Sequence, residues 1–168
     1  MIVFYSRSGE NYIGGVIKEL SVGNTEYIAR LLEEKLKIPS VRIKRKDGDF
    51  YDYNECLKQT LFENENDIFP ELQEINVPER LKIIYLGFPV FWQALPRAVV
   101  SFLKSQDFSA IEIRPFCTYE CSGRENCITQ IKKLCHGSVM RKALYIKGHC
   151  VREQSAELRL DQWIKTFG

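Results

Sequence analysis

Short apolar runs recur at wide intervals along the chain, and this spacing constrains the fold more than any other feature. The runs occupy residues 2–5, 40–43, 81–87, 111–117 and 139–146. Several of them, such as the stretch LKIIYLGFPVF, are almost entirely apolar, which is typical of a strand covered on both faces. Each run is too short to be a helix of ordinary length, so we predict five buried β-strands.

The segments between these runs have helical periodicity. Residues 24–36, for example, place Ile28, Leu32 and Leu36 on one stripe and charged residues elsewhere. Further helices are predicted at residues 97–103, 125–134 and 153–167, with another candidate at 53–64. Strands that alternate with helices imply right-handed crossovers and a parallel sheet with helices on both faces. No repeat or linker interrupts the pattern, so we expect one doubly wound α/β domain over residues 1–168.

Composition excludes several classes of protein. Hydrophobic residues make up 45% of the chain and charged residues 27%, an ordinary globular balance. There is neither an apolar stretch long enough to span a membrane nor a signal peptide, so we expect a cytoplasmic protein. A net charge of +2 gives no reason to expect nucleic acid as a partner. The six cysteines form no CxxC pair, and with His136 they match no zinc-binding spacing, so no metal site is predicted.

In such a sheet, ligands bind beyond the carboxyl ends of the strands, where the strand order reverses. After the first strand comes SRSGEN, but a helix start, GNTE, follows only about a dozen residues later. We therefore predict a phosphate site in two pieces, although SRSG alone could be an ordinary turn. The intervening residues 12–22 could cover the phosphate or a neighbouring subunit. The predicted residues in and around these two pieces are Ser6, Arg7, Ser8, Asn11, Gly23, Asn24 and Thr25.

Two further loops lie at the same edge of the predicted sheet. The stretch GFPVFWQALP follows the third strand, and its large aromatic residues either cover the core or stack on a flat ligand. The stretch CTYECSG follows the fourth strand, and it is either an ordinary turn capped by Ser122 or the last wall of a pocket. The candidate ligand-binding residues in these loops are Pro89, Val90, Phe91, Trp92, Thr118, Tyr119, Glu120, Ser122 and Gly123.

Several motifs resemble those of flavodoxin-like proteins, in the same order and over nearly the whole chain. In chain order they are SRSG, GNTE, DYNEC, GFPVFW and PFCTYECSG. The resemblance implies a five-stranded sheet in the order 2-1-3-4-5 and one non-covalently bound FMN. The SRSG and GNTE residues would then hold the phosphate, GFPVFW would flank the isoalloxazine ring, and CTYECSG would close its other side. The resemblance also makes Glu120 a candidate for tuning the flavin potential.

This chain departs from the family pattern at three positions. It has Phe91 where a tryptophan is common, Tyr119 where a histidine is common, and Cys121 where a glycine is common. The cysteine could turn away from the ring or weaken its binding. The chain is also slightly basic, whereas flavodoxins that carry electrons are typically acidic.

Three functions therefore stay open. The protein could be an electron carrier with a protein redox partner, or an enzyme that oxidises NAD(P)H and reduces a quinone or similar small acceptor. It could also have the fold without the cofactor. We expect a monomer or weak dimer. His136 and His149 lie outside the predicted flavin loops, and no nucleophile–base pair indicates a hydrolase.

Overall fold

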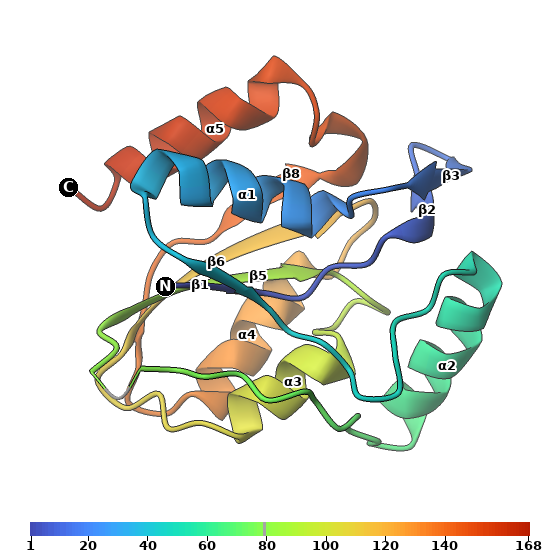
Figure 1. The fold of residues 1–168 in the computed structure, drawn as a ribbon, viewed down its shortest axis with the longest axis horizontal. Coiled ribbons are helices and arrows are strands. Elements are labelled where there is room, and N and C mark those ends of the chain that lie inside the picture. Colours follow the sequence, from blue (N-terminus) through green and yellow to red (C-terminus); the bar gives the residue numbers. More distant parts are fainter. Residues whose placement is uncertain (79) are drawn as a thin grey trace.

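A parallel β-sheet forms the centre of the protein in the computed structural model, which describes residues 1–78 and 80–168 (Figure 1). Its strands are β1 (Ile2–Phe4), β4 (Ser40–Arg42), β5 (Ile83–Pro89), β6 (Glu112–Tyr119), β7 (Val139–Met140) and β8 (Leu144–Lys147). The order is β4-β1-β5-β6, with β7 and β8 both paired to β6, and all these pairs are parallel.

The predicted order 2-1-3-4-5 is confirmed, with one difference at the last strand. The sheet has six strands rather than five, because the predicted run at 139–146 is divided into β7 and β8. The residues between them, Arg141 to Ala143, are polar or small and lie outside the ladder. β7 pairs with the first half of β6 and β8 with its second half, so together they form the edge of the sheet beside β6.

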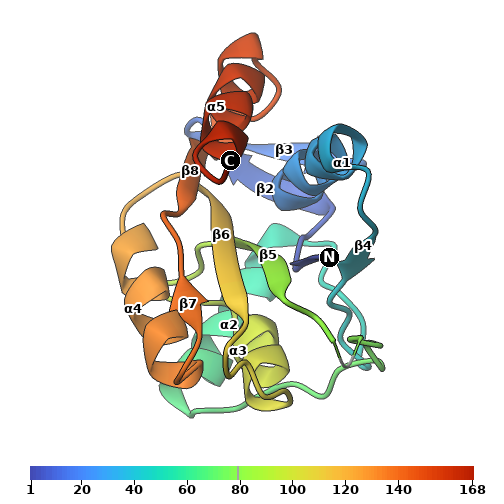
Figure 2. The ribbon, with the colours of Figure 1, turned by 90° about the vertical axis from the view of Figure 1, so that its left-hand side faces the viewer.

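Helices cover both faces of the sheet (Figures 1 and 2). Helices α1 (Asn24–Leu36) and α5 (Gln154–Lys165) lie on one face, where Ile28, Leu32 and Leu160 are fully buried. On the other face lie α3 (Arg97–Lys104) and α4 (Arg124–Leu134), with α2 (Tyr53–Glu65) beside them. Two separate apolar cores result, which explains why the central strands are apolar on both sides.

The inserted segment after the first strand is a β-hairpin. Strands β2 (Gly9–Ile13) and β3 (Val16–Leu20) pair with each other in antiparallel fashion and form a separate two-stranded sheet. The hairpin therefore begins earlier than the predicted insertion at 12–22. It lies at the end of the molecule where α1 begins (Figure 1), and Val16 and Ile17 near its tip are about half exposed.

The predicted helices are all present, within two residues of the expected bounds. The N-terminal cap of α4 differs from the prediction, because the residue before this helix is Gly123 and not Ser122. Within the described residues, no helix is long and apolar enough to cross a membrane. The same part of the chain holds no group of three His, Cys, Asp or Glu side chains placed to bind a metal ion.

Candidate functional site

A cavity of about 340 Å³ lies at the carboxyl ends of β1, β5 and β6, where the strand order reverses. Its walls come from the three predicted loops, the start of α1, the hairpin and α2. The lining residues are Ser6, Arg7, Asn11, Tyr12, Asn24, Thr25, Tyr53, Cys56, Leu57, Thr60, Pro89, Val90, Phe91, Trp92, Gln93, Thr118, Tyr119, Glu120, Cys121, Ser122 and Gly148.

The first loop and the start of α1 form one polar end of this cavity. Ser6 Oγ accepts a hydrogen bond of 3.0 Å from the N–H of Glu26, so it caps α1 from outside the helix. The N–H groups of Asn24 and Thr25 have no acceptor among the described residues. The hydroxyls of Thr25 and Thr118, both buried, share a hydrogen bond of 2.8 Å. This end presents N–H and O–H donors at the positive end of a helix.

Gly23 makes the close approach of these two segments possible. A Cβ atom at this position would collide with the carbonyl oxygen of Arg7 and with Ser6 Oγ. Gly23 does not itself line the cavity. Its role is therefore to let the first loop sit against the start of α1, which brings the two halves of the predicted phosphate site together.

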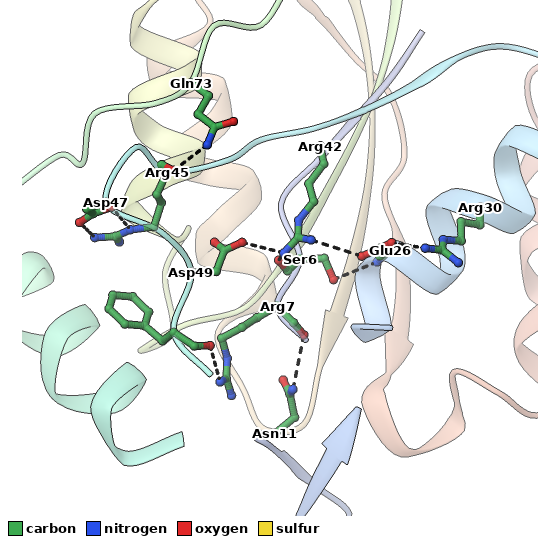
Figure 3. A network of polar contacts seen from close by, with 11 residues as sticks. Ser6, Arg7, Asn11, Glu26, Arg30, Arg42, Arg45, Asp47, Asp49 and Gln73 are labelled. Atoms are coloured by element: carbon green, nitrogen blue, oxygen red, sulfur yellow. Dashed lines mark hydrogen bonds and ion pairs between the residues drawn. The ribbon is translucent and has the colours of Figure 1, made fainter. Parts of the chain in front are cut away.

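Arg7 closes the first loop onto the chain that precedes α2. Its side chain is 5% exposed and donates to the carbonyl oxygens of Phe50, Tyr51 and Glu10, the first two at 3.1 and 3.2 Å (Figure 3). Asn11 donates to the carbonyl oxygens of Arg7 and Gly9. The guanidinium group of Arg7 thus holds the backbone, and because these partners are neutral carbonyls, Arg7 also brings a positive charge to the cavity wall.

A second arginine supports the first loop from behind. Arg42 donates to the Ser6 carbonyl oxygen at 2.8 Å and to Asp49 at 2.7 Å, and it lies 3.7 Å from the Glu26 carboxylate (Figure 3). Burial raises the pKa of Asp49, although the positive charges of Arg42 and Arg45 oppose this rise. The network ties strand β4, the first loop and the first turn of α1 into one unit.

The second loop forms the aromatic wall of the cavity. Phe91 packs edge-on against Tyr5 at a centroid distance of 6.3 Å, whereas Trp92 is 41% exposed at the mouth. Thr60 on α2 anchors Trp92, since the indole N–H donates to its hydroxyl at 3.0 Å. Two alternatives were predicted for these aromatic residues, covering the core or stacking on a flat ligand. Phe91 fits the first alternative, and the exposed Trp92 fits the second.

The third loop brings Glu120 to a place where three segments meet. One carboxylate oxygen, Oε2, accepts from the N–H of Gly14 at the hairpin tip at 3.3 Å and lies 3.0 Å from His149 Nδ1. The other, Oε1, is buried and has no hydrogen-bond partner among the described residues. A buried acceptor that borders a cavity without a donor is a candidate ligand contact.

Gly123 and Cys121 also belong to this loop. Gly123 has a φ of 99°, and a Cβ atom there would collide with the backbone of Gln93, so it lets the second and third loops touch. Cys121 is exposed and borders the cavity. It is not among the described residues with positive φ, so its backbone conformation does not require the glycine that is common in the family.

Most of the residues predicted from the sequence line the cavity. The exceptions are Ser8, Gly23 and Gly123, which lie beside it. The sequence interpretation missed a wall made by the hairpin and α2, to which Tyr12, Tyr53 and Thr60 belong. It also missed the turn after β8, because His149 contacts Glu120 and Gly148 borders the cavity. The sequence predicted a helix at 53–64 and contained the DYNEC motif at its start, but neither signal placed that helix at the cavity.

Comparisons with known proteins agree with this architecture. A family model described as Flavodoxin matches residues 29–167. Among solved structures, a candidate flavoprotein from Bacteroides uniformis has a TM-score of 0.73 at 20% identity, with 98% of this chain and 96% of that chain covered. A flavoprotein from Lactobacillus acidophilus in complex with FMN has a TM-score of 0.64 at 19% identity, with 97% and 96% covered.

A more distant structure has the same fold. Oxidised flavodoxin 2 from Bacillus cereus has a TM-score of 0.52 at 15% identity, with 97% of this chain and 94% of that chain covered. No curated protein matches the sequence. The family match extends over most of the chain and includes the second and third loops of the cavity, so the chain belongs to the flavodoxin family.

Proposed function

We propose that the protein binds one FMN non-covalently in the cavity and transfers electrons through it. The observation that carries this proposal is the meeting of three strand-end loops and the start of α1 around one cavity of about 340 Å³. Cofactor pockets usually measure about 300–1,000 Å³, so there is room for one flavin mononucleotide. The FMN complex of the structurally similar Lactobacillus acidophilus flavoprotein adds support.

The polar end of the cavity would hold the phosphate. The free N–H groups of Asn24 and Thr25 and the hydroxyls of Ser6 and Thr25 are donors that a phosphate requires. Ser8 follows in the same loop and Gly23 directly precedes Asn24, but neither lines the cavity, so we assign them a supporting role. The donor set contains no lysine, and an anion held by neutral donors suits a helix N-terminus.

The other end of the cavity suits the isoalloxazine ring. Pro89, Val90, Phe91 and Trp92 would lie along one side, and Tyr119, Cys121 and Ser122 would close the other. Glu120 Oε1 would accept a hydrogen bond from a ligand hydroxyl, which would satisfy its buried lone pairs. When bound, FMN would supply one- or two-electron chemistry, and the protein would bind, orient and shield it.

A second candidate function is an NAD(P)H-dependent oxidoreductase that reduces a quinone or a similar small acceptor. A net charge of +2 favours it over a carrier that docks by acidic surface charge on a basic reductase. The exposed rings of Tyr12 and Trp92 at the cavity mouth would also suit a planar apolar acceptor.

Titration of the purified protein with FMN tests the proposal. We expect the wild type to bind FMN, and Thr25→Val to bind it more weakly, because this change removes a hydroxyl that lines the cavity. The matched control is Thr129→Val on the exposed face of α4, which should bind FMN as the wild type does. A wild-type protein that ignores FMN would contradict the proposal and favour a fold that has lost its cofactor.

Anaerobic addition of NADPH to the FMN-loaded protein separates the two functions. Rapid bleaching by NADPH alone would favour the oxidoreductase that acts on small acceptors. Bleaching only after a separate reductase is added would favour the electron carrier. Analytical ultracentrifugation of the same sample tests whether the protein is a monomer or a weak dimer.

A further inference from the structure

The turn after β8, residues 148–152, contacts the start of α1, and its first residue, Gly148, lines the cavity. The carbonyl oxygen of Gly148 accepts from the side-chain amide of Asn24 at 3.1 Å. A Cβ atom at Gly148 would collide with the Glu120 carboxylate and lie 2.8 Å from the Asn24 amide nitrogen. The turn therefore sits directly against the first residue of α1.

Arg152, at the end of this turn, makes two short hydrogen bonds to the entry of α1. Its guanidinium donates to Asn24 Oδ1 and to the carbonyl oxygen of Val22, both at 2.6 Å, and lies 5.0 Å from the ring centroid of Tyr27. With Gly148 on its other side, the Asn24 amide has both of its polar atoms engaged. The orientation of Asn24 and the path of the chain into α1 therefore depend on Arg152.

The charge of Arg152 is unusual for its position. A cation at a helix N-terminus opposes the helix dipole and normally destabilises the helix. The ion pairs found among residues 1–78 and 80–168 do not include Arg152, so no carboxylate there compensates its charge. Glu26, the acid in the first turn of α1, is already paired with Arg30 at 2.5 Å. A bound anion would compensate both Arg152 and the helix end.

Glu120 gives the cavity a charge of the opposite sign. Its carboxylate borders the cavity close to Gly148 and would repel a dianion. Arg7, which lines the cavity, supplies one positive charge against this repulsion, and Arg152 would supply a second. Arg152 is exposed and does not itself line the cavity, but its hydrogen bond to Asn24 places its positive charge beside the first residue of α1.

We propose that Arg152 is a specificity-determining residue that makes the cavity select a flavin with a terminal phosphate over the same flavin without one. This inference rests on the proposed function. Arg152 acts by positioning Asn24 and by supplying positive charge to the phosphate cradle. Its effect should therefore appear in the affinity for FMN and be absent from the affinity for riboflavin, which ends in a hydroxyl.

The test compares FMN and riboflavin affinities, measured by flavin fluorescence, for the wild type, Arg152→Gln and Arg152→Lys. We expect Arg152→Gln to weaken FMN binding by about 5- to 30-fold and to leave riboflavin binding within about 2-fold, given the upper range of charge effects at helix ends. Arg152→Lys keeps the charge but lacks the planar fork that matches the two acceptors, so it should recover part of the loss. Added salt should weaken FMN binding less in Arg152→Gln than in the wild type.

The matched control is Arg159→Gln on α5, which removes one positive charge from an exposed position. It should bind both flavins as the wild type does. Equal weakening of FMN and riboflavin in Arg152→Gln, or an Arg152→Gln protein indistinguishable from Arg159→Gln, would overturn this inference and leave the proposed function intact. A wild type that binds neither flavin would overturn both together.

Discussion

The indole N–H of Trp92 donates to the Thr60 hydroxyl at 3.0 Å, and this bond fixes an exposed ring at the mouth of the cavity. The turn that carries the ring is tight, because Phe91 and Ala94 bond each other through both backbone groups. Within it, Trp92 and Gln93 have φ values of 51° and 58°. A left-handed conformation is costly for such residues and often marks a functional site.

Removing the Trp92 ring should weaken the binding of FMN. We expect Trp92→Ala to reduce FMN affinity by roughly 1–3 kcal/mol, because a stacked aromatic contact is lost. Thr60→Val should have a smaller effect, since it only frees the ring to move. The control is Phe62→Ala, an exposed aromatic residue of α2 that does not line the cavity. Unchanged FMN affinity in Trp92→Ala would mean that the ring does not contact the cofactor.

Removing the charge of Glu120 should raise the reduction potential of bound FMN. A carboxylate that borders the cavity opposes the negative charge that reduction adds, by roughly 1 kcal/mol at moderate distance in a partly polar medium. Glu120→Gln keeps the shape of the side chain and removes this repulsion. Redox titration measures the effect, and Glu34→Gln on the exposed face of α1 is a charge-matched control. Equal potentials in all three proteins would exclude Glu120 from redox tuning.

The sheet and three of the cavity walls could be predicted because their signals are local in the sequence. Each buried strand is a continuous apolar run, and parallel strands necessarily bring their end loops to one edge. Ser6, Trp92 and Thr118 border one cavity for this reason. The periodicity of α1 was equally local, and its observed bounds are those predicted, 24–36.

The remaining walls depend on contacts that no local pattern encodes. The hairpin at Gly9–Leu20 carries no turn signal beyond Gly14 and Gly15, and its place is set by hydrogen bonds to the distant residues Tyr51 and Glu120. His149 and Arg152 follow β8, so their positions depend on how the edge strand is divided into β7 and β8. Their contacts with Glu120 and Asn24 join residues more than twenty positions apart.

The buried ion pair between Arg45 and Glu63 should be essential for stability. Two hydrogen bonds of 2.7 and 3.1 Å join the side chains, both of which are 2% exposed. Burial on its own would lower the pKa of Arg45, but hydrogen bonds to Asp47 and Glu63 raise it above its ordinary value. We expect Glu63→Gln to destabilise the protein by about 3 kcal/mol in urea unfolding, because it leaves the buried Arg45 with only the exposed Asp47 as a counterion.

Two further variants make this test specific. Replacement of both residues, Arg45→Met with Glu63→Leu, should restore much of the lost stability, because no buried charge remains. Glu71→Gln breaks the exposed pair with Lys46 and should change stability little. A double variant no more stable than Glu63→Gln would show that packing around the pair, rather than charge, was lost.

Buried thiols should make the protein less stable in alkali. Burial raises the pKa of Cys127 to about 12 and that of Cys135 to about 11, against roughly 8.5 in an unfolded chain. The stability that these thiols contribute is complete below the unfolded value and is lost as the pH rises toward the folded values, because only the unfolded chain releases the protons.

The alkaline effect can be assigned to individual cysteines. In urea unfolding between about pH 8 and about pH 10.5, we expect the wild type to lose up to about 1.4 kcal/mol per pH unit for each such thiol. Cys135→Ala should lose less stability across this range than the wild type does, whereas Cys121→Ala, at an exposed position, should lose as much. Parallel curves for Cys135→Ala and the wild type would contradict the assignment.

Cys121 should become protected when FMN binds. Of the six thiols it is the exposed one that borders the cavity, while Cys56, Cys117, Cys127 and Cys135 are buried. A bound flavin would cover this part of the wall, so maleimide labelling of Cys121, measured by mass spectrometry, should slow when FMN is added. Cys150, which is partly exposed and does not line the cavity, serves as the internal reference. A labelling rate for Cys121 that FMN leaves unchanged would place the cofactor away from the third loop.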